Sequence, residues 1–93
     1  MPETVVDNAA AGRFELALPG GIAFIAYRHA DGVVSLDHAE VPAALGGQGL
    51  GTRLVRETLE LIRSRGESIV PVCGYVRSFV ARHVEFTGLV RAP

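Results

Sequence analysis

Four glycines stand within six residues near the middle of this chain, in the segment Gly46–Gly51, immediately before a stretch with helical periodicity. Glycine costs conformational entropy, so this density indicates a backbone that turns sharply or leaves room for a ligand. The first N–H groups of the following helix have no helical partners and lie at the positive end of its dipole. The segment therefore predicts a cradle for phosphate or pyrophosphate, with a purely structural turn as the alternative.

The residues before this segment have the pattern of three strands. Hydrophobic alternation and short β-rich runs are separated by the turn signals Pro19-Gly20-Gly21 and Asp31-Gly32. The three predicted strands are Arg13–Leu18, Ile22–Arg28 and Val33–Val41. Strict alternation in the third places Val34, Leu36, His38 and Glu40 on one face.

The residues after the segment predict a helix over about 49–65, whose buried stripe has helical spacing. The stripe consists of Leu50, Leu54, Val55, Thr58, Leu59 and Ile62. On the outer face, Arg53–Glu57 and Arg56–Glu60 are expected to pair. Gly66 is a suitable helix stop.

A fourth strand is expected over Ser68–Val72 and a second helix over 74–83. The fourth strand should pair parallel to the third, because a long helix connects them. The 93 residues suit one domain, 1–93, of the α+β class, with a mixed sheet in the order β-β-β-α-β-α. The last residues, Phe86 to Pro93, are expected to add a short edge strand or to pack down.

Composition excludes several classes of function. All nine basic residues are arginine, so a phosphate loop with its lysine and lysine Schiff-base chemistry are both excluded. The net charge of −1 argues against nucleic acid binding. With Cys73 as the only cysteine, no internal disulfide can form. The chain has neither a signal-peptide pattern nor an apolar run long enough to cross a membrane, so a cytoplasmic protein is expected.

Two other ligand types fail on spacing. A dinucleotide fingerprint starting at Gly47 has its second glycine at Gly49, but the third position is Thr52. The cysteine and the three histidines have no short spacing of the zinc type, so no metal site is expected.

Five short segments stand in a characteristic order along the chain. They are Arg13-Phe14-Glu15, His38-Ala39-Glu40-Val41-Pro42, Gly46-Gly47-Gln48-Gly49-Leu50-Gly51, Pro71-Val72-Cys73 and Arg82-His83-Val84-Glu85-Phe86. Taken together, they resemble the compact branch of the GCN5-related N-acetyltransferase superfamily. Gly49 and Gly51 match the two small positions of its acyl-CoA motif, [Q/R]-x-x-G-x-[G/A], whereas Gly46 replaces the usual Arg or Gln. Ala39 and Val84 depart from the Thr and Pro of that branch.

The resemblance implies that the chain binds acetyl-CoA and transfers its acetyl group to an amine. The thioester would lie across the end of the third strand, beside Val41, with the pyrophosphate on the glycine segment. The cofactor-binding residues implied are Val41, Gly46, Gly47, Gln48, Gly49, Leu50, Gly51, Thr52 and Arg82. Arg82 would meet the adenosine phosphate of the cofactor.

Three residues are candidates for the chemistry. Glu40, directly or through water, or His38 would take the proton from the amine; a plain polar strand end is the alternative. Cys73 is either a nucleophile that accepts the acetyl group first or a wall of the cofactor channel. His83 is expected to be a hydrogen-bonded core histidine.

Two other functions stay open on the sequence. A non-catalytic module could hold CoA or another phosphorylated ligand, and a plain interaction domain could use the glycines only as a turn. The acceptor is expected to bind at an open, shallow site, because no helical segment separates the first two predicted strands. The sequence indicates no oligomeric state.

Overall fold

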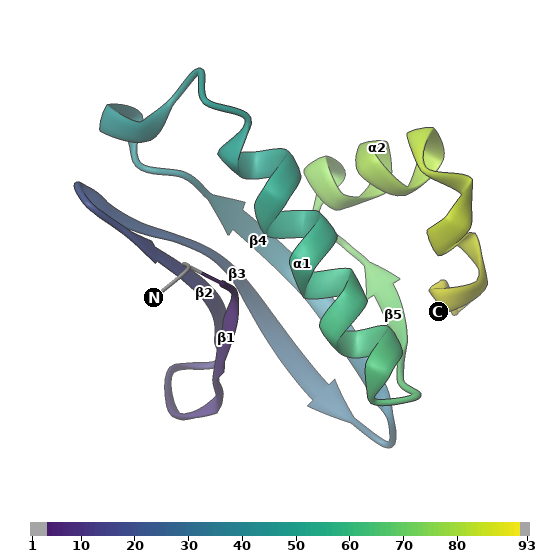
Figure 1. Cartoon of the computed structure of the whole chain (residues 1–93). Helices are drawn as coiled ribbons and strands as arrows, with labels where there is room; N and C mark the ends of the chain where they lie inside the picture. The colour runs from purple at the N-terminus through teal and green to yellow at the C-terminus, as the bar shows by residue number, and fades with distance from the viewer. Residues whose placement is uncertain (1–3, 92–93) are drawn as a thin grey trace.

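The computed structural model describes residues 4–91 and has one mixed sheet of five strands in sequence order (Figure 1). The strands are β1 (Val6–Asn8), β2 (Arg13–Leu18), β3 (Gly21–Ala30), β4 (Val33–Glu40) and β5 (Ser68–Pro71). The helices are α1 (Leu50–Ser64) and α2 (Gly74–Arg82), followed by a 3-10 segment over Val84–Leu89. Strands β1 to β4 are antiparallel, and β5 pairs parallel to β4.

The predicted α+β class and the parallel crossover through α1 are confirmed. The predicted three-strand meander is one strand short, because β1 adds a further antiparallel strand at the edge. Only three residues long and polar in part, β1 carries no periodic signal of its own. Its place depends on pairing with β2 and on a hydrogen bond of 2.9 Å from the Val5 N–H to the Glu57 carboxylate on α1.

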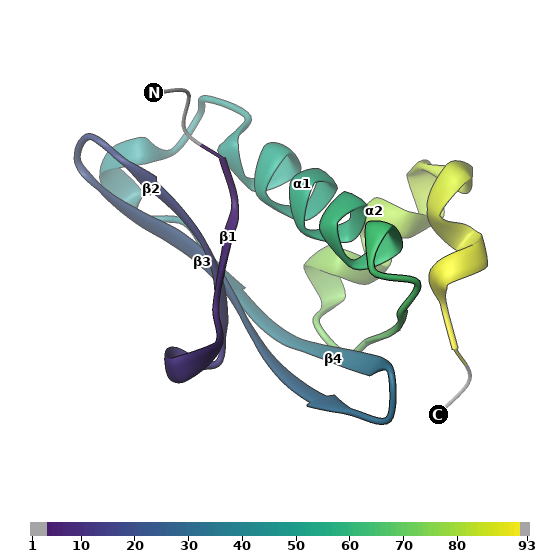
Figure 2. The same cartoon turned by 60° about the horizontal axis from the view of Figure 1, so that its bottom comes forward.

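Both helices cover the same face of the sheet, and no helix of the described chain covers the other face (Figure 2). The core between sheet and helices includes Phe14, Leu16, Ile25, Leu36, Ile69, Phe79 and Phe86. The predicted stripe of α1 supplies five buried residues, Leu54, Val55, Thr58, Leu59 and Ile62. Neither helix is both long enough and apolar enough to span a membrane.

The strict alternation predicted for β4 is wrong after Leu36. The register between β3 and β4 shifts at Ala26/Tyr27, so that Tyr27 pairs with Leu36 whereas Ala26 pairs with His38. The extra residue, Asp37, forms a bulge that reverses the faces of everything after it. Val34 and Leu36 therefore face the core, while His38 and Glu40 lie on the uncovered face of the sheet.

One of the two predicted ion pairs on α1 is present. The Arg53 and Glu57 side chains are 2.6 Å apart. Arg56 does not pair with Glu60 and instead lies 3.5 Å from Glu85, with its guanidinium 5.5 Å from the Phe79 ring centroid. α2 and the tail after it, unlike a solvated helix face, offer this arginine both a carboxylate and aromatic rings.

The C-terminal segment packs down rather than forming an edge strand. Its 3-10 segment buries Phe86, and the only strand-like contact in the described part is a single parallel bridge between Ile69 and Val90. Residues 92 and 93, at the end of the predicted segment, lie outside the described residues.

Candidate functional site

The glycine segment has the conformation that its composition predicts. Gly47 and Gly49 have φ angles of +79° and +70°, and a side chain at either position would project into open space. Such φ values strongly favour glycine. Gly49 caps the N-terminus of α1 through its backbone only, because no side chain makes a capping hydrogen bond there.

The backbone donors of this segment are largely unpaired. The N–H of Arg53 donates to the carbonyl of Gly49 at 3.1 Å, and this is the first helical hydrogen bond of α1. No acceptor in the described chain pairs with the N–H groups of residues 47–52. The N–H of Gly46 is different, because it donates to the Ala43 carbonyl at 3.1 Å. Gly46 therefore does not belong to the row of unpaired donors.

No acidic side chain stands in the first turn of α1 to neutralise the positive end of the helix. The glycines from 46 to 49 and Gln48 are exposed, so the unpaired groups can be reached from solvent. Thr52 is also exposed and offers its hydroxyl at the same helix end. These groups are the backbone donors on which the predicted anion cradle depends.

A cavity of about 180 Å³ lies where the end of β4 meets the start of α1. Its lining residues are Ala39, Glu40, Val41, Gly51, Leu54 and Tyr75. The cavity brings together the predicted site residues Glu40, Val41 and Gly51. The N–H of Val41 has no acceptor in the described chain.

Tyr75, in the first turn of α2, is the functional candidate that the sequence analysis missed. Its hydroxyl lies over the α-carbon of Gly51, and a Cβ at Gly51 would overlap it. The side chain is 46% exposed and forms part of the cavity wall. The signal available in the sequence was a large aromatic residue two positions after Cys73, at the start of a predicted helix.

Glu40 and His38 lie together on the uncovered face of the sheet. The His38 Nε2 atom is 3.3 Å from a Glu40 carboxylate oxygen, and both side chains are more than 60% exposed. The Phe24 ring lies edge-on to His38, with ring centroids 6.2 Å apart, and the Arg13 guanidinium lies 4.4 Å from the Phe24 centroid. This group can exchange protons with water and can be approached by a bulky acceptor.

Two further ion pairs balance the charges of this face. Arg13 pairs with Glu15, and together with Asn8 it holds the pKa of the Glu15 carboxyl below its ordinary value. Arg28 lies 2.7 Å from Asp37 and lowers the pKa of that carboxyl in the same way. These pairs leave Glu40 with only the imidazole of His38 beside it among the described residues.

Cys73 lies between β5 and α2. Its N–H donates to the Leu36 carbonyl at 2.9 Å, and its side chain is partly buried against the core. No imidazole or carboxylate in the described chain contacts its sulfur. The core lies on the opposite face of the sheet from His38 and Glu40.

Arg82, expected at the adenosine phosphate, and His83, expected to be a core histidine, do not line this cavity. Arg82 lies at the last turn of α2, exposed, with its Nε donating to the Ser78 carbonyl at 3.3 Å. It lies about 10 Å along the helix from Tyr75, seven residues on. His83 stacks on Phe79 with ring centroids 3.9 Å apart and a ring nitrogen 2.8 Å from the Phe79 carbonyl, as expected for a core histidine.

No group of three or more potential metal ligands occurs among residues 4–91. The cavity and the adjoining helix end offer backbone donors, one carboxylate with its imidazole, and one phenol. Such a set can bind an anionic ligand at the helix end and can accept a proton beside it.

Comparisons with known proteins bear on the family and the fold of this chain. A model of the family described as GCN5-related N-acetyl-transferase matches residues 13–89. The chain is similar in structure to a GCN5-like candidate N-acetyltransferase from Staphylococcus aureus, solved by NMR, with 22% sequence identity and a TM-score of 0.70. That match covers 96% of this chain and 88% of the other. No match was found among curated proteins. The chain belongs to the GCN5-related N-acetyltransferase family.

Proposed function

We propose that this protein transfers the acetyl group of acetyl-CoA to a primary amine. The observation that carries the proposal is the row of unpaired N–H groups over residues 47–52, next to a cavity lined by Glu40 and Val41. The pyrophosphate of CoA would accept hydrogen bonds from this row at the positive end of α1. Tyr75 and Leu54 would contact the apolar part of the cofactor in the cavity.

The thioester would lie beside Val41, at the end of β4. The unpaired N–H of Val41 would donate to the thioester carbonyl oxygen, which gains negative charge in the transition state. The amine nitrogen attacks the carbonyl carbon, an amide bond forms, and the C–S bond breaks. The departing thiolate of CoA takes up a proton, so the products are an amide and CoA.

The amine must lose a proton before or during attack. Glu40 is the residue we assign to this step, directly or through water, with His38 at 3.3 Å able to pass the proton on to solvent. Both side chains are exposed on the uncovered sheet face, so the acceptor would approach from that face (Figure 2). The tight turn between β2 and β3 leaves this approach open, which suits an amine on a protein or a polyamine.

The surroundings of Cys73 support the role of a channel wall rather than that of a nucleophile. A thiol nucleophile needs a base within hydrogen-bond reach, and no imidazole or carboxylate of the described chain touches this sulfur. Mass spectrometry after rapid quenching with acetyl-CoA tests this. An acetyl adduct on Cys73 would assign it the nucleophilic role instead.

The decisive experiment compares two glycine substitutions. Gly49→Ala and Gly32→Ala each place a methyl group at a φ near +70° in open space, so both should cost roughly 1 kcal/mol of stability. Only Gly49 lies in the proposed cradle. Titration calorimetry should therefore show CoA binding by the wild type and by Gly32→Ala, and binding at least tenfold weaker, about 1.4 kcal/mol, by Gly49→Ala.

Two outcomes would change the assignment. If CoA gives no heat with the wild type, the glycine segment is structural and the proposal fails. If CoA binds but acetyl-CoA is not consumed with any amine of a broad panel, the chain is a non-catalytic CoA-binding module. Thermal unfolding provides a second reading, because CoA at 100 times its dissociation constant should stabilise the fold by about 2.7 kcal/mol.

A further inference from the structure

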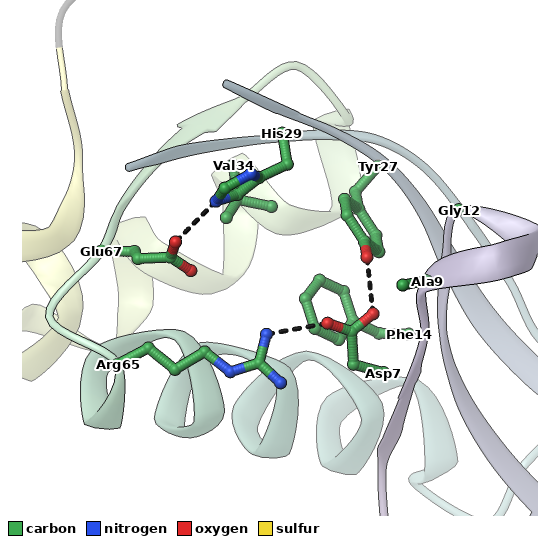
Figure 3. A pocket seen from close by; sticks show the side chains of 9 residues that line it. All are labelled: Asp7, Ala9, Gly12, Phe14, Tyr27, His29, Val34, Arg65 and Glu67. Carbon is green, nitrogen blue, oxygen red and sulfur yellow. Dashed lines mark hydrogen bonds and ion pairs between the residues drawn. The ribbon is translucent and has the colours of Figure 1, made fainter. Parts of the chain in front are cut away.

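A second cavity, of about 500 Å³, lies at the opposite end of α1 from the glycine segment (Figure 3). Arg65, which follows the last residue of α1, stands at one side of it. The 15 residues of α1 separate the two sites by about 22 Å along the helix. Nothing in the acyl-transfer proposal uses this cavity.

The acidic side chains of this cavity are less exposed than their basic partners. Figure 3 shows Asp7 between Tyr27 and Arg65, and Glu67 facing His29. The Tyr27 hydroxyl donates to Asp7 at 2.5 Å, Arg65 donates to it at 2.8 Å, and His29 lies 2.5 Å from Glu67. The Asp7 and Glu67 side chains are only 16% and 19% exposed, whereas Arg65 and His29 are 42% and 46% exposed. The carboxylates are thus inside and their basic partners at the rim.

The C-terminal end of α1 makes the interior more negative. It reaches the cavity and carries the negative end of the helix dipole. Burial raises the pKa of Tyr27 to about 12; the hydrogen bond to Asp7 and the charges of Asp7 and Glu67 add to this rise, whereas the charge of Arg65 opposes it.

Tyr27 presents an aromatic ring to the cavity, and the buried ring of Phe14 packs against it. The rings of Phe14 and Tyr27 are in contact, with centroids 4.5 Å apart and planes inclined at 32°. Aromatic faces attract cations and pack well against methylene or methyl groups. One oxygen of Glu67 is bonded to His29, and its other oxygen has no partner among the described residues.

We propose that this cavity is a binding site for a small organic cation, an ammonium group on a short apolar body. The ammonium would lie against the carboxylate of Glu67 and the negative end of α1. The apolar body would lie on the ring of Tyr27, which packs on the buried ring of Phe14. An anion that passed Arg65 and His29 at the rim would meet two carboxylates and the carbonyl end of a helix inside, which disfavour it.

Amide NMR titration of the full chain tests the proposal, with n-butylammonium and tetramethylammonium as probes and n-butyrate as the anionic control. We expect saturable shifts at the amides of Gly12, His29 and Glu67, with dissociation constants on the order of millimolar, ordinary for ligands of so few atoms. The amides of Gly47 and Gly49 should not move. Equal shifts with butyrate, or none with either cation, would overturn the proposal.

Two variants with opposite expected effects locate the site. Glu67→Gln should weaken butylammonium binding about tenfold, while Asp37→Asn, which removes a carboxylate from the uncovered sheet face, should leave it unchanged. His29→Ala frees both oxygens of Glu67 and should strengthen binding, so the site stays testable if Glu67→Gln does not fold. Unchanged affinity in Glu67→Gln, or weaker affinity in His29→Ala, would contradict the assignment.

Discussion

The hydroxyl of Tyr75 occupies the space that a side chain at residue 51 would need. This contact joins the first turn of α2 to the first turn of α1, at the cavity where the cofactor is proposed to lie. Glycine is therefore needed at position 51 because Tyr75 leaves no room for a side chain. The backbone conformation does not require it, since the φ of Gly51 lies outside the left-handed region. The contact makes the second small position of the acyl-CoA motif a packing requirement in this chain.

Gly51→Ala should therefore displace the Tyr75 ring. Alanine within a helix gains up to about 1 kcal/mol over glycine, and the overlap should cancel this gain. In a Tyr75→Ala background the overlap is absent, so Gly51→Ala should then stabilise the fold by about 0.5–1 kcal/mol. Urea denaturation of the four proteins of this cycle measures the coupling. An equal effect of Gly51→Ala in both backgrounds would show that the two residues do not interact.

The pair of Glu40 and His38 gives a kinetic prediction. Glu40→Gln should lower kcat about 100-fold at saturating amine, because general base catalysis typically contributes at least this much. CoA affinity should not change, because the unpaired N–H groups of residues 47–52 belong to the backbone. His38→Gln should lower kcat less, since water can replace the imidazole on this exposed face. A Glu40→Gln enzyme with the kcat of the wild type would remove Glu40 from the reaction.

The sequence predicted the elements whose signal is local. The stripe of α1 repeats at helical spacing, the turn at Asp31-Gly32 has its characteristic pair, and Gly66 has the positive φ expected at a helix stop. The glycine segment was predicted for the same reason, because its glycines hold backbone conformations that other residues adopt rarely.

The features that were missed depend on contacts between distant parts of the chain. The bulge at Asp37 is set by pairing with β3 and by the ion pair with Arg28, neither of which is visible in β4 alone. Strand β1 is held by Glu57, about fifty residues away. Tyr75 lies at the cavity only because α2 packs against α1. Hydrophobic periodicity indicates which residues are buried along one element. It does not indicate which residues of another element they contact.

Acidic pH should weaken the attachment of the N-terminal segment. Burial alone would raise the pKa of Glu57, but hydrogen bonds from Arg53, the Val5 N–H and Thr4 outweigh it and hold this pKa below its ordinary value. A carboxyl with a lowered pKa stabilises the fold above its unfolded pKa, and this contribution is lost as the pH falls through the folded value. Stability should therefore decrease below about pH 4.5.

Glu57→Gln isolates this contribution. It should cost about 1–3 kcal/mol at pH 7 and make the stability less dependent on pH between 7 and 3, as measured by urea midpoints. Glu60→Gln is the matched control on the same helix, because the described chain offers no partner to the Glu60 side chain. An equal loss of pH dependence in both variants would show that Glu57 has no special role.

The titration of Tyr27 at alkaline pH tests the surroundings of this residue in the second cavity. The pKa of this phenol is raised to about 12, so the fold favours its protonated form. That contribution is fully present below about pH 10, the ordinary tyrosine value, and is lost as the pH rises toward 12. The chain has no lysine, so the side chains that dominate titration in this range are its two tyrosines. In Tyr75→Phe, phenolate absorbance reports Tyr27 alone and should rise with a midpoint near pH 12.

The acceptor of the Tyr27 proton can be tested in the same variant. Adding Asp7→Asn removes a charged acceptor and its field, so the midpoint should fall toward the ordinary value, whereas adding Asp37→Asn should not move it. Tyr27→Phe should cost about 1 kcal/mol at pH 7, because it removes one hydrogen bond. It should also flatten the fall in stability between pH 10 and 12. A midpoint near pH 10 in Tyr75→Phe would mean that Asp7 and Glu67 do not make this cavity negative, and the cation proposal would lose its electrostatic basis.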